Sequence, residues 1–140
     1  MLMPTITHDK SKTIKPIVMK IIPLFKCRNM EQALKHYTGV LDFKIKYPED
    51  VSSGVVDLIN GSAELQLTTY EGDYLFGSVA NIVVDDVDSL FQKYLSRGLD
   101  TSGKKDSPVH QGPTDQTWGR REFYVTDQDK NTLRFCQVIK

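Results

Sequence analysis

The chain has 140 residues, of which 39% are hydrophobic and 26% charged, with as many basic as acidic side chains. This size and composition fit an ordinary globular domain. A chain with a net charge of zero lacks the excess positive charge that attracts nucleic acid or an anionic membrane, so we expect neither as a partner. The apolar runs are far shorter than the roughly 20 residues of a membrane helix. The N-terminus lacks the apolar core of a signal peptide, and a cytoplasmic location is expected.

Residues 1–16 are polar and contain two prolines, and they are predicted to form a flexible arm before a single domain at 17–140. The first half of that domain begins with a β-branched, apolar run at 17–27, which predicts a buried strand. Asn29 is a candidate cap for a helix with the apolar stripe Met30, Ala33, Leu34, Tyr37 and Leu41. Residues 43–47 alternate as a strand, and 54–69 predict a hairpin with Asn60-Gly61 in a type I′ turn.

The same order of elements then recurs. Residues 78–86 predict a strand, and Asp85 or Asp86 can cap a second helix with the stripe Val87, Leu90, Phe91, Tyr94 and Leu95. Gly98 is suited to end that helix. A loop at 101–117 precedes two strands that meet around Asp127–Asn131.

The two predicted helices can be aligned residue by residue, with Tyr37 over Tyr94. Each half therefore has the pattern β-α-β-β-β, in modules at about 17–72 and 77–140. A module of this kind has a helix on only one face of its sheet. The prediction is an α+β fold of two tandem βαβββ modules whose curved mixed sheets form a cup, closed by the second module or by a partner chain.

Three stretches carry a family resemblance: PLFKCRNMEQALKHYTGVLDF, VVDDVDSLFQKYLSRG and TWGRREFYVTDQDKNTLRF. The last is similar to the ending of bleomycin resistance-like members of the vicinal oxygen chelate superfamily. Gln128 and Lys130 stand where that pattern has Pro and Gly, and Asn131 is a residue that tolerates positive φ. The resemblance, which spans about residues 17–138, implies the paired-module fold and a ligand site in the cup.

Enzymes of this superfamily commonly hold a divalent metal through two His and one Glu, and the matching positions here are Ile22, Val79 and Arg134. Aliphatic side chains have no lone pair, and Arg only donates hydrogen bonds. We therefore expect no metal and no other cofactor. His8, His36 and His110 share no element at ligand spacing, and we interpret them as solvated. Cys27 and Cys136 are predicted to be reduced, buried thiols.

Arg134 alternates with two apolar residues in the last strand, so its side chain is predicted to point into the cup. It can anchor an anionic or carbonyl-bearing ligand. Alternatively it forms an internal pair with Glu122, which the closing hairpin would place diagonally on the same face, with Tyr124 directly opposite. For Trp118, the resemblance implies a stacking role at the ligand cleft, and packing of a loop is the alternative. In the first module Asp57, Glu64 and Gln66 share one hairpin face that could line the cup.

We therefore predict a homodimer that binds a small organic molecule without a metal, in the manner of bleomycin resistance proteins, with antibiotic sequestration as one use of such binding. The ligand-binding residues are predicted to be Gln66, Trp118, Glu122, Tyr124 and Arg134. One alternative is a glyoxalase-like lyase or isomerase, with Glu122 as base and Arg134 as charge stabiliser. A second alternative is an interaction module that binds no ligand.

Overall fold

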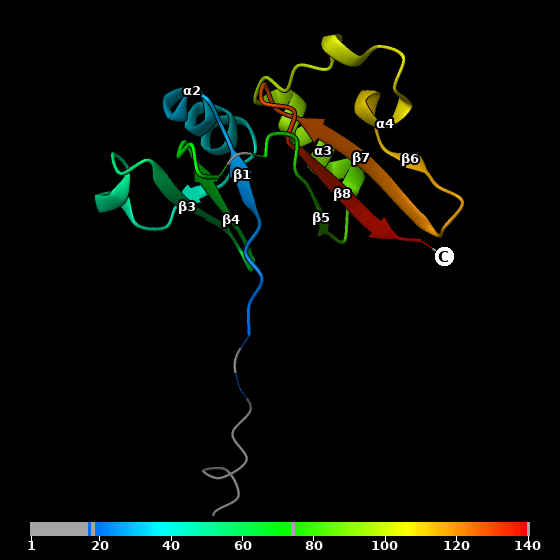
Figure 1. Ribbon diagram of the computed structural model, residues 1–140. Coiled ribbons are helices and arrows are strands. Elements are labelled where there is room, and N and C mark those ends of the chain that lie inside the picture. Colours follow the sequence, from blue (N-terminus) through cyan, green and yellow to red (C-terminus); the bar gives the residue numbers. More distant parts are fainter. Residues whose placement is uncertain (1–16, 18, 74, 140) are drawn as a thin grey trace, which may run out of the picture.

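The computed structural model describes residues 17, 19–73 and 75–139, so the predicted arm at 1–16 lies outside the described residues (Figure 1). The first half contains β1 (Leu24–Lys26), α2 (Met30–Leu34) continuing into the π-helical segment η2 (Lys35–Val40), β2 (Lys44–Ile45), η3 (Pro48–Asp50), β3 (Val55–Asn60) and β4 (Ala63–Thr68). The second half contains β5 (Val79–Val83), α3 (Val87–Ser96), η4 (Ser102–Lys104), α4 (Pro108–Gln111), β6 (Thr114–Asp115), β7 (Arg120–Thr126) and β8 (Thr132–Val138). No helix in the described part of the chain is long and apolar enough to cross a membrane.

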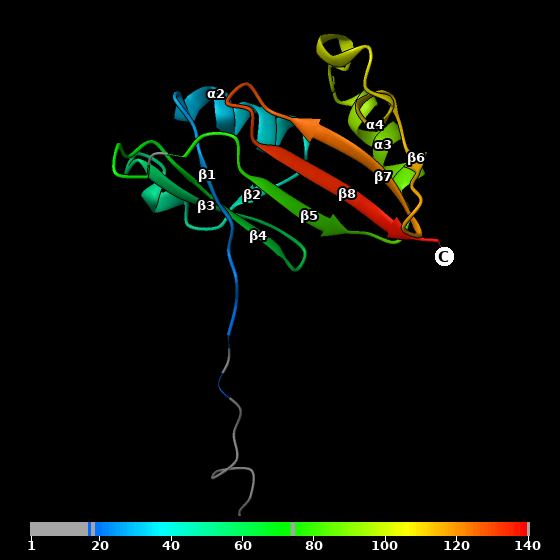
Figure 2. The same cartoon turned by 45° about the vertical axis from the view of Figure 1, so that its right-hand side comes forward.

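The two halves form two four-stranded sheets with the same topology, β1-β4-β3-β2 and β5-β8-β7-β6. In each sheet the first strand runs parallel to the last, and the other pairs are antiparallel. The helices cover one face of each sheet, and the sheets lie side by side (Figures 1 and 2). The repeat and the α+β class predicted from the sequence are therefore confirmed.

Local signals place the helices where the sequence predicts them. The Asn29 side chain accepts a hydrogen bond from the Gln32 amide at 2.9 Å, and Asp86 accepts one from the Ser89 amide at 3.0 Å. These carboxylate and amide oxygens satisfy amides that have no partner within the helix. Gly98 follows α3 with φ at 97°, a left-handed conformation that favours glycine.

One continuous core fills the space between the helices and the covered faces of the two sheets. In the first module the inward side chains of the hairpin are fully buried: Val56, Leu58, Leu65 and Leu67. In the second module Phe123 stacks on Phe135 with ring centroids 4.9 Å apart, and Tyr94 meets Phe135 edge-on at 5.4 Å. Cys27 and Cys136 are buried and free, as predicted.

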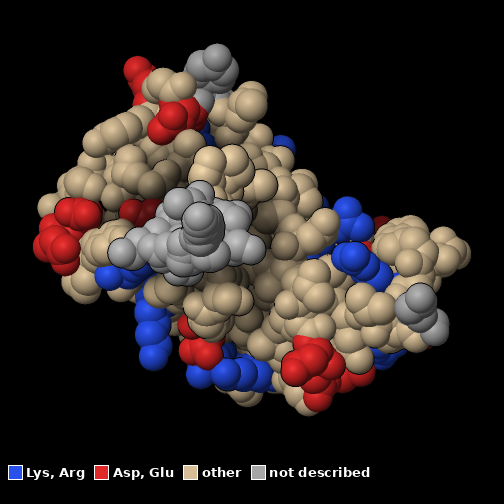
Figure 3. All heavy atoms as spheres, turned by 90° about the horizontal axis from the view of Figure 1, so that it is seen from below, with Lys and Arg blue, Asp and Glu red and all other residues tan. Residues whose placement is uncertain are grey.

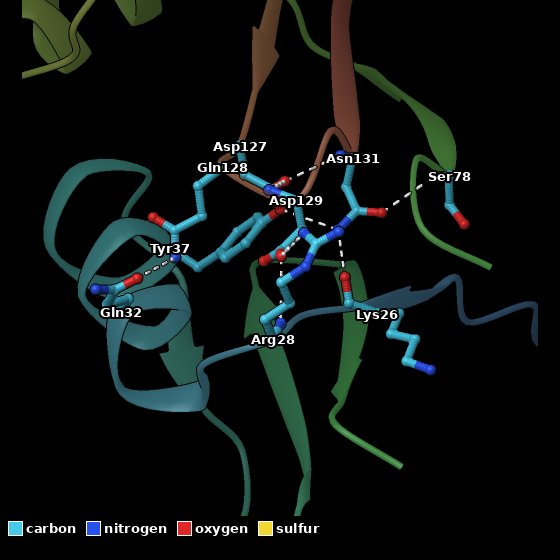
Figure 4. A network of polar contacts seen from close by, with 9 residues as sticks. All are labelled: Lys26, Arg28, Gln32, Tyr37, Ser78, Asp127, Gln128, Asp129 and Asn131. Carbon is cyan, nitrogen blue, oxygen red and sulfur yellow. Dashed lines mark hydrogen bonds and ion pairs between the residues drawn. The ribbon is translucent and has the colours of Figure 1, made fainter. Parts of the chain in front are cut away.

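The turn between β7 and β8 joins the second module to the first through a polar network (Figure 4). Tyr37 of η2 donates its hydroxyl hydrogen to Asp127 Oδ2 at 2.7 Å, and Asn131 Nδ2 donates to the Lys26 carbonyl at 2.8 Å. Arg28 pairs with Asp129 at 2.8 Å. Asp129 and Asn131 are buried, so these bonds lie in a setting where an unpaired polar group would be costly.

Three of the predicted elements differ from the structure. The predicted loop at 101–117 contains η4, α4 and the edge strand β6. The predicted strand at 17–27 is formed only over Leu24–Lys26, and Ile17, Met19 and Ile21 are 82%, 85% and 93% exposed because nothing in the described chain covers them. The β3–β4 hairpin is formed, but Asn60 pairs with Ala63, and the turn residues are Gly61 and Ser62. Only Gly61 has positive φ, which is the pattern of a type II′ turn rather than type I′.

The link between Tyr37 and Asp127 should stabilise the fold more than its counterpart in the other half, where the Tyr94 hydroxyl donates to the neutral Leu41 carbonyl at 3.2 Å. We expect Tyr37→Phe to lower the free energy of unfolding by about 1.5–3 kcal/mol, because a bond to a charged group is lost. Tyr94→Phe, the matched control, should cost about 0.5–1.5 kcal/mol. Urea unfolding of both variants measures this, and a larger loss for Tyr94→Phe would contradict it.

Candidate ligand-binding site

The second sheet has one face that its helix does not cover, and we call it the open face. Alternation places it opposite the buried Phe123, Leu133 and Phe135. Its side chains are Val79, Asn81 and Val83 of β5, Thr132 and Arg134 of β8, and Glu122, Tyr124 and Thr126 of β7. A cavity of about 500 Å³ lies at this face, lined by Val79, Lys104, His110, Tyr124, Thr126, Lys130, Thr132 and Arg134. Its size is ordinary for a small-molecule site.

Four of the residues predicted from the sequence meet in one hydrogen-bonded network on this face. Glu122 lies at its centre, only 2% exposed. Its Oε2 accepts from the Trp118 indole at 3.0 Å, and its Oε1 accepts from the Tyr124 hydroxyl at 2.9 Å and from Arg134 Nη2 at 3.2 Å. Tyr124 lies directly opposite Arg134 in the register, as the sequence predicts.

The network keeps Glu122 ionised. Burial opposes its ionisation, but the hydrogen bonds from Trp118, Tyr124 and Arg134 outweigh burial and lower the pKa of Glu122. Burial and the neighbouring carboxylate raise the pKa of Tyr124, which therefore stays protonated and donates. A carboxylate whose oxygens are both occupied and whose pKa is lowered binds a catalytic proton poorly.

Arg134 is held in place by this network, yet most of its donor capacity remains unused among the described residues. Only Nη2 donates, to Glu122, while Nε is buried without a partner. The guanidinium also lies over the Tyr124 ring, 4.7 Å from its centroid, and Asn81 is its exposed neighbour on β5. The result is a fixed, partly exposed cation that lines the cavity.

His110 is a part of this site that the sequence does not reveal. Its Nε2 lies 2.8 Å from the Thr126 hydroxyl, its Nδ1 lies 2.7 Å from the Ser107 hydroxyl, and its ring meets Tyr124 edge-on. Burial lowers the pKa of His110, and so does Lys104. The interpretation of the histidines as solvated is wrong also for His36, whose Nε2 is buried without a partner among the described residues and whose pKa burial lowers. His8 lies outside the described residues.

Gln66 is not brought to this network within the chain. It lies on β4 of the first sheet, where its amide donates to Asp57 at 2.9 Å. Glu64 of the same strand pairs with Lys46 at 2.9 Å and with Lys20. These polar residues share the face opposite the buried side of the hairpin, as predicted, but no described contact links Gln66 to Arg134.

The family of this chain is shown by sequence comparison. The sequence model of the Glyoxalase/Bleomycin resistance protein/Dioxygenase superfamily matches residues 24–135. The chain belongs to this superfamily. No curated protein matches it.

Several solved structures share the fold. A bleomycin-binding protein complexed with bleomycin is 21% identical, with 86% of this chain and 98% of that chain covered and a TM-score of 0.65. A bleomycin resistance determinant encoded on the transposon Tn5 is 19% identical, with the same coverage and a TM-score of 0.69. A bleomycin-binding protein from Streptomyces verticillus, complexed with copper(II)-bleomycin, is 19% identical, with 86% and 96% covered and a TM-score of 0.62.

The metal site that the superfamily implies does not fit the residues of this chain. Ile22 and Val79 carry no ligating atom, and Arg134 is a cation already paired with Glu122. Among the described residues no group of three or more His, Cys, Asp or Glu side chains could hold a metal ion. The open face therefore offers hydrogen bonds, a positive charge and aromatic surface rather than a set of side chains that could coordinate a metal ion.

Because the pKa of Glu122 is lowered in the folded chain, its ionised form stabilises the fold above its unfolded pKa, about 4.3. That contribution should disappear as pH falls through the folded pKa. We expect Glu122→Gln to be less stable than the wild type at pH 7, with the difference shrinking towards acid. Tyr124→Phe removes one of the three donors and should show the same trend with a smaller amplitude. Urea unfolding across this pH range measures both, and a difference that grows on acidification would contradict the prediction.

Proposed function

We propose that this protein binds a small organic molecule with an anionic or carbonyl group at the open face, without a metal and without turnover. The observation that carries the proposal is Arg134, a guanidinium held by Glu122 and Tyr124 with most of its donors unused beside a cavity. Such a donor suits the oxygens of a carboxylate or carbonyl. Trp118, 57% exposed and fixed through its indole N–H, adds aromatic surface at the end of the same network.

The alternative as a lyase or isomerase is less well supported by the same residues. Glu122 is the candidate base, but it is buried, ionised and bonded through both oxygens. An effective general base has a raised pKa near the working pH and access to the substrate proton. Glu122 instead serves to position Arg134.

The alternative as an interaction module without a ligand would require a filled cup. Glu122, Tyr124 and Arg134 do pair with one another, as that alternative expects. They nevertheless leave the neighbouring cavity open, with polar groups of His110, Thr126 and Thr132 along its wall. Small-molecule binding therefore accounts for more of the observed surface.

The bleomycin-binding proteins that share the fold suggest sequestration as the biological use of such binding. Bleomycin is a cationic ligand, whereas this site carries Arg134 with Lys104 and Lys130 around the cavity. Like charges brought together in a desolvated site repel. We therefore favour an anionic or neutral carbonyl compound over bleomycin.

Benzoate and its neutral analogue benzamide form a matched pair of probes, with bleomycin as the cationic comparison. After chelation of metals, we expect benzoate to raise the melting temperature by mass action and to change the fluorescence of Trp118, the sole tryptophan. Arg134→Gln should weaken benzoate binding by about tenfold or more, the loss of one hydrogen bond between charged groups. Arg97→Gln, which alters a guanidinium at the C-cap of α3 paired with Asp42, is the control and should leave binding unchanged.

Three outcomes would contradict the proposal. Bleomycin could stabilise the chelated protein while benzoate and benzamide do not. Arg134→Gln could bind benzoate as tightly as the wild type. Stabilisation could also require an added divalent metal, which would favour metal-dependent chemistry instead.

We infer that the protein is a homodimer, in which a second copy covers residues 17 and 19–22. Ile17, Met19 and Ile21 are exposed, and they belong to the segment before β1 that runs away from both modules (Figure 2). The neighbouring β5 is an edge strand with Val79 and Val83 exposed. Viewed from below, the surface in view beside the described segment is largely uncharged, with acidic and basic residues around it (Figure 3). Exposed edges and apolar side chains of this kind are usually covered in native proteins.

Light scattering after size exclusion should give twice the chain mass. Ile21→Asp combined with Met19→Asp should shift the protein towards monomer, because a second copy would have to bury two carboxylates. Val51→Asp changes a comparably apolar exposed residue near η3 and should leave the dimer intact. A wild-type monomer, or a dimer that survives the double substitution, would overturn the inference.

A further inference from the structure

Lys26 is a nearly buried cation on the other sheet, where no site has been described above. It belongs to β1, pairs in register with Thr68 of β4, and is only 9% exposed. Its side chain leaves the strand on the side away from the polar network of the β7–β8 turn (Figure 4). There it lines a cavity of about 310 Å³ between β1, β4 and the segment that joins the two modules.

The ammonium of Lys26 is poorly satisfied for a buried charge. Its one hydrogen bond among the described residues is a long one, 3.4 Å, to the Glu71 carbonyl. It also lies 5.1 Å from the centre of the Phe76 ring, a ring that Arg28 covers at 4.1 Å. No carboxylate of the described chain comes within ion-pair distance of it, although an ammonium can donate three hydrogen bonds. A buried charge of this kind is costly unless something pairs with it.

The remaining walls indicate what would pair with it. Leu24 and Leu75 are exposed apolar side chains, while Thr68 and Ser78 contribute polar ones. Asp73 is the single carboxylate among the lining residues, and its Oδ2 is taken by the Thr68 hydroxyl at 2.8 Å. The cavity thus combines an apolar rim with a cation that forms no ion pair among the residues the structure describes.

The geometry points to a second ligand site at Lys26, which takes a small organic carboxylate with a short apolar tail. The carboxylate accepts from the Lys26 ammonium inside the cavity, and the tail packs against Leu24 and Leu75. This site lies on the first sheet and shares no lining residue with the cavity beside Arg134. Ligand binding at Lys26 can therefore be tested independently of ligand binding at the open face of the second sheet.

Hexanoate and hexanol are suitable probes, since they share a tail and differ in charge. In proton–nitrogen correlation spectra of the full chain, hexanoate should shift the amides of Thr68, Ser78 and Leu75, whereas hexanol at the same concentration should not. Lys26→Met keeps the length of the side chain and removes the charge, and it should weaken hexanoate binding by about tenfold or more. In Asp73→Asn the amide oxygen can still accept the hydrogen bond from Thr68. The variant lacks the negative charge that repels the hexanoate carboxylate, so it should bind hexanoate more tightly.

Lys44→Met is the matched control, because Lys44 is an exposed lysine on β2 at the far edge of the same sheet. It should bind hexanoate as the wild type does. Equal shifts with hexanol would overturn the proposal, since the cavity would then recognise only the tail. Unchanged binding by Lys26→Met, weaker binding by Asp73→Asn, or the absence of shifts at these amides in the wild type would also overturn it. Arg134→Gln should not alter these shifts, because Arg134 belongs to the open face of the second sheet. This variant therefore distinguishes binding at Lys26 from binding at the open face.

Discussion

The docking of the β7–β8 turn onto the first module is the contact on which the arrangement of the chain depends. Each module has a helix on only one face, so the covered faces can share a core only if the two modules are held in a fixed relation. Tyr37 and the backbone of Lys26 supply that relation by binding Asp127 and Asn131. Asn131 is buried and Asp127 is partly buried, so separation of the modules would break bonds that water replaces only in part. The opposite faces are left open as a direct consequence.

That geometry also determines what the open face of the second sheet can do. Because β7 and β8 are paired in a fixed register, Glu122 and Tyr124 come to Arg134 from neighbouring positions of one strand. The Glu122 carboxylate neutralises the guanidinium beside the core, and the guanidinium also lies over the Tyr124 ring. A lone arginine would be disordered in solvent or too costly to bury. Fixing it with one partner leaves an oriented donor, which is the property that binding of an anionic or carbonyl group requires.

Much of this could be predicted because it depends on local rules. The caps at Asn29 and Asp86, the alternation of the hairpin and the pairing of Tyr124 with Arg134 all follow from patterns along one segment. The parts that failed depend on what packs against a segment. Residues 17 and 19–22 have strand composition but pair with no strand of the described chain, and His110 reaches the sheet only because α4 packs against β7. Near 130 the local rule itself misleads, since Lys130 rather than Asn131 takes positive φ.

Lys130 shows how one tertiary contact outweighs that local preference. A non-glycine residue in the left-handed region costs about 1–2 kcal/mol, and lysine has no side-chain bond that compensates locally. At φ 69° it bears this cost, while Asn131 binds Ser78, the Lys26 carbonyl and Asp127. If Asn131 took the left-handed conformation instead, its side chain would no longer reach Ser78 and the Lys26 carbonyl, and these buried hydrogen bonds would be lost. The free energy of docking the two modules therefore sets the conformation of the turn, and with it the register that holds Glu122 against Arg134.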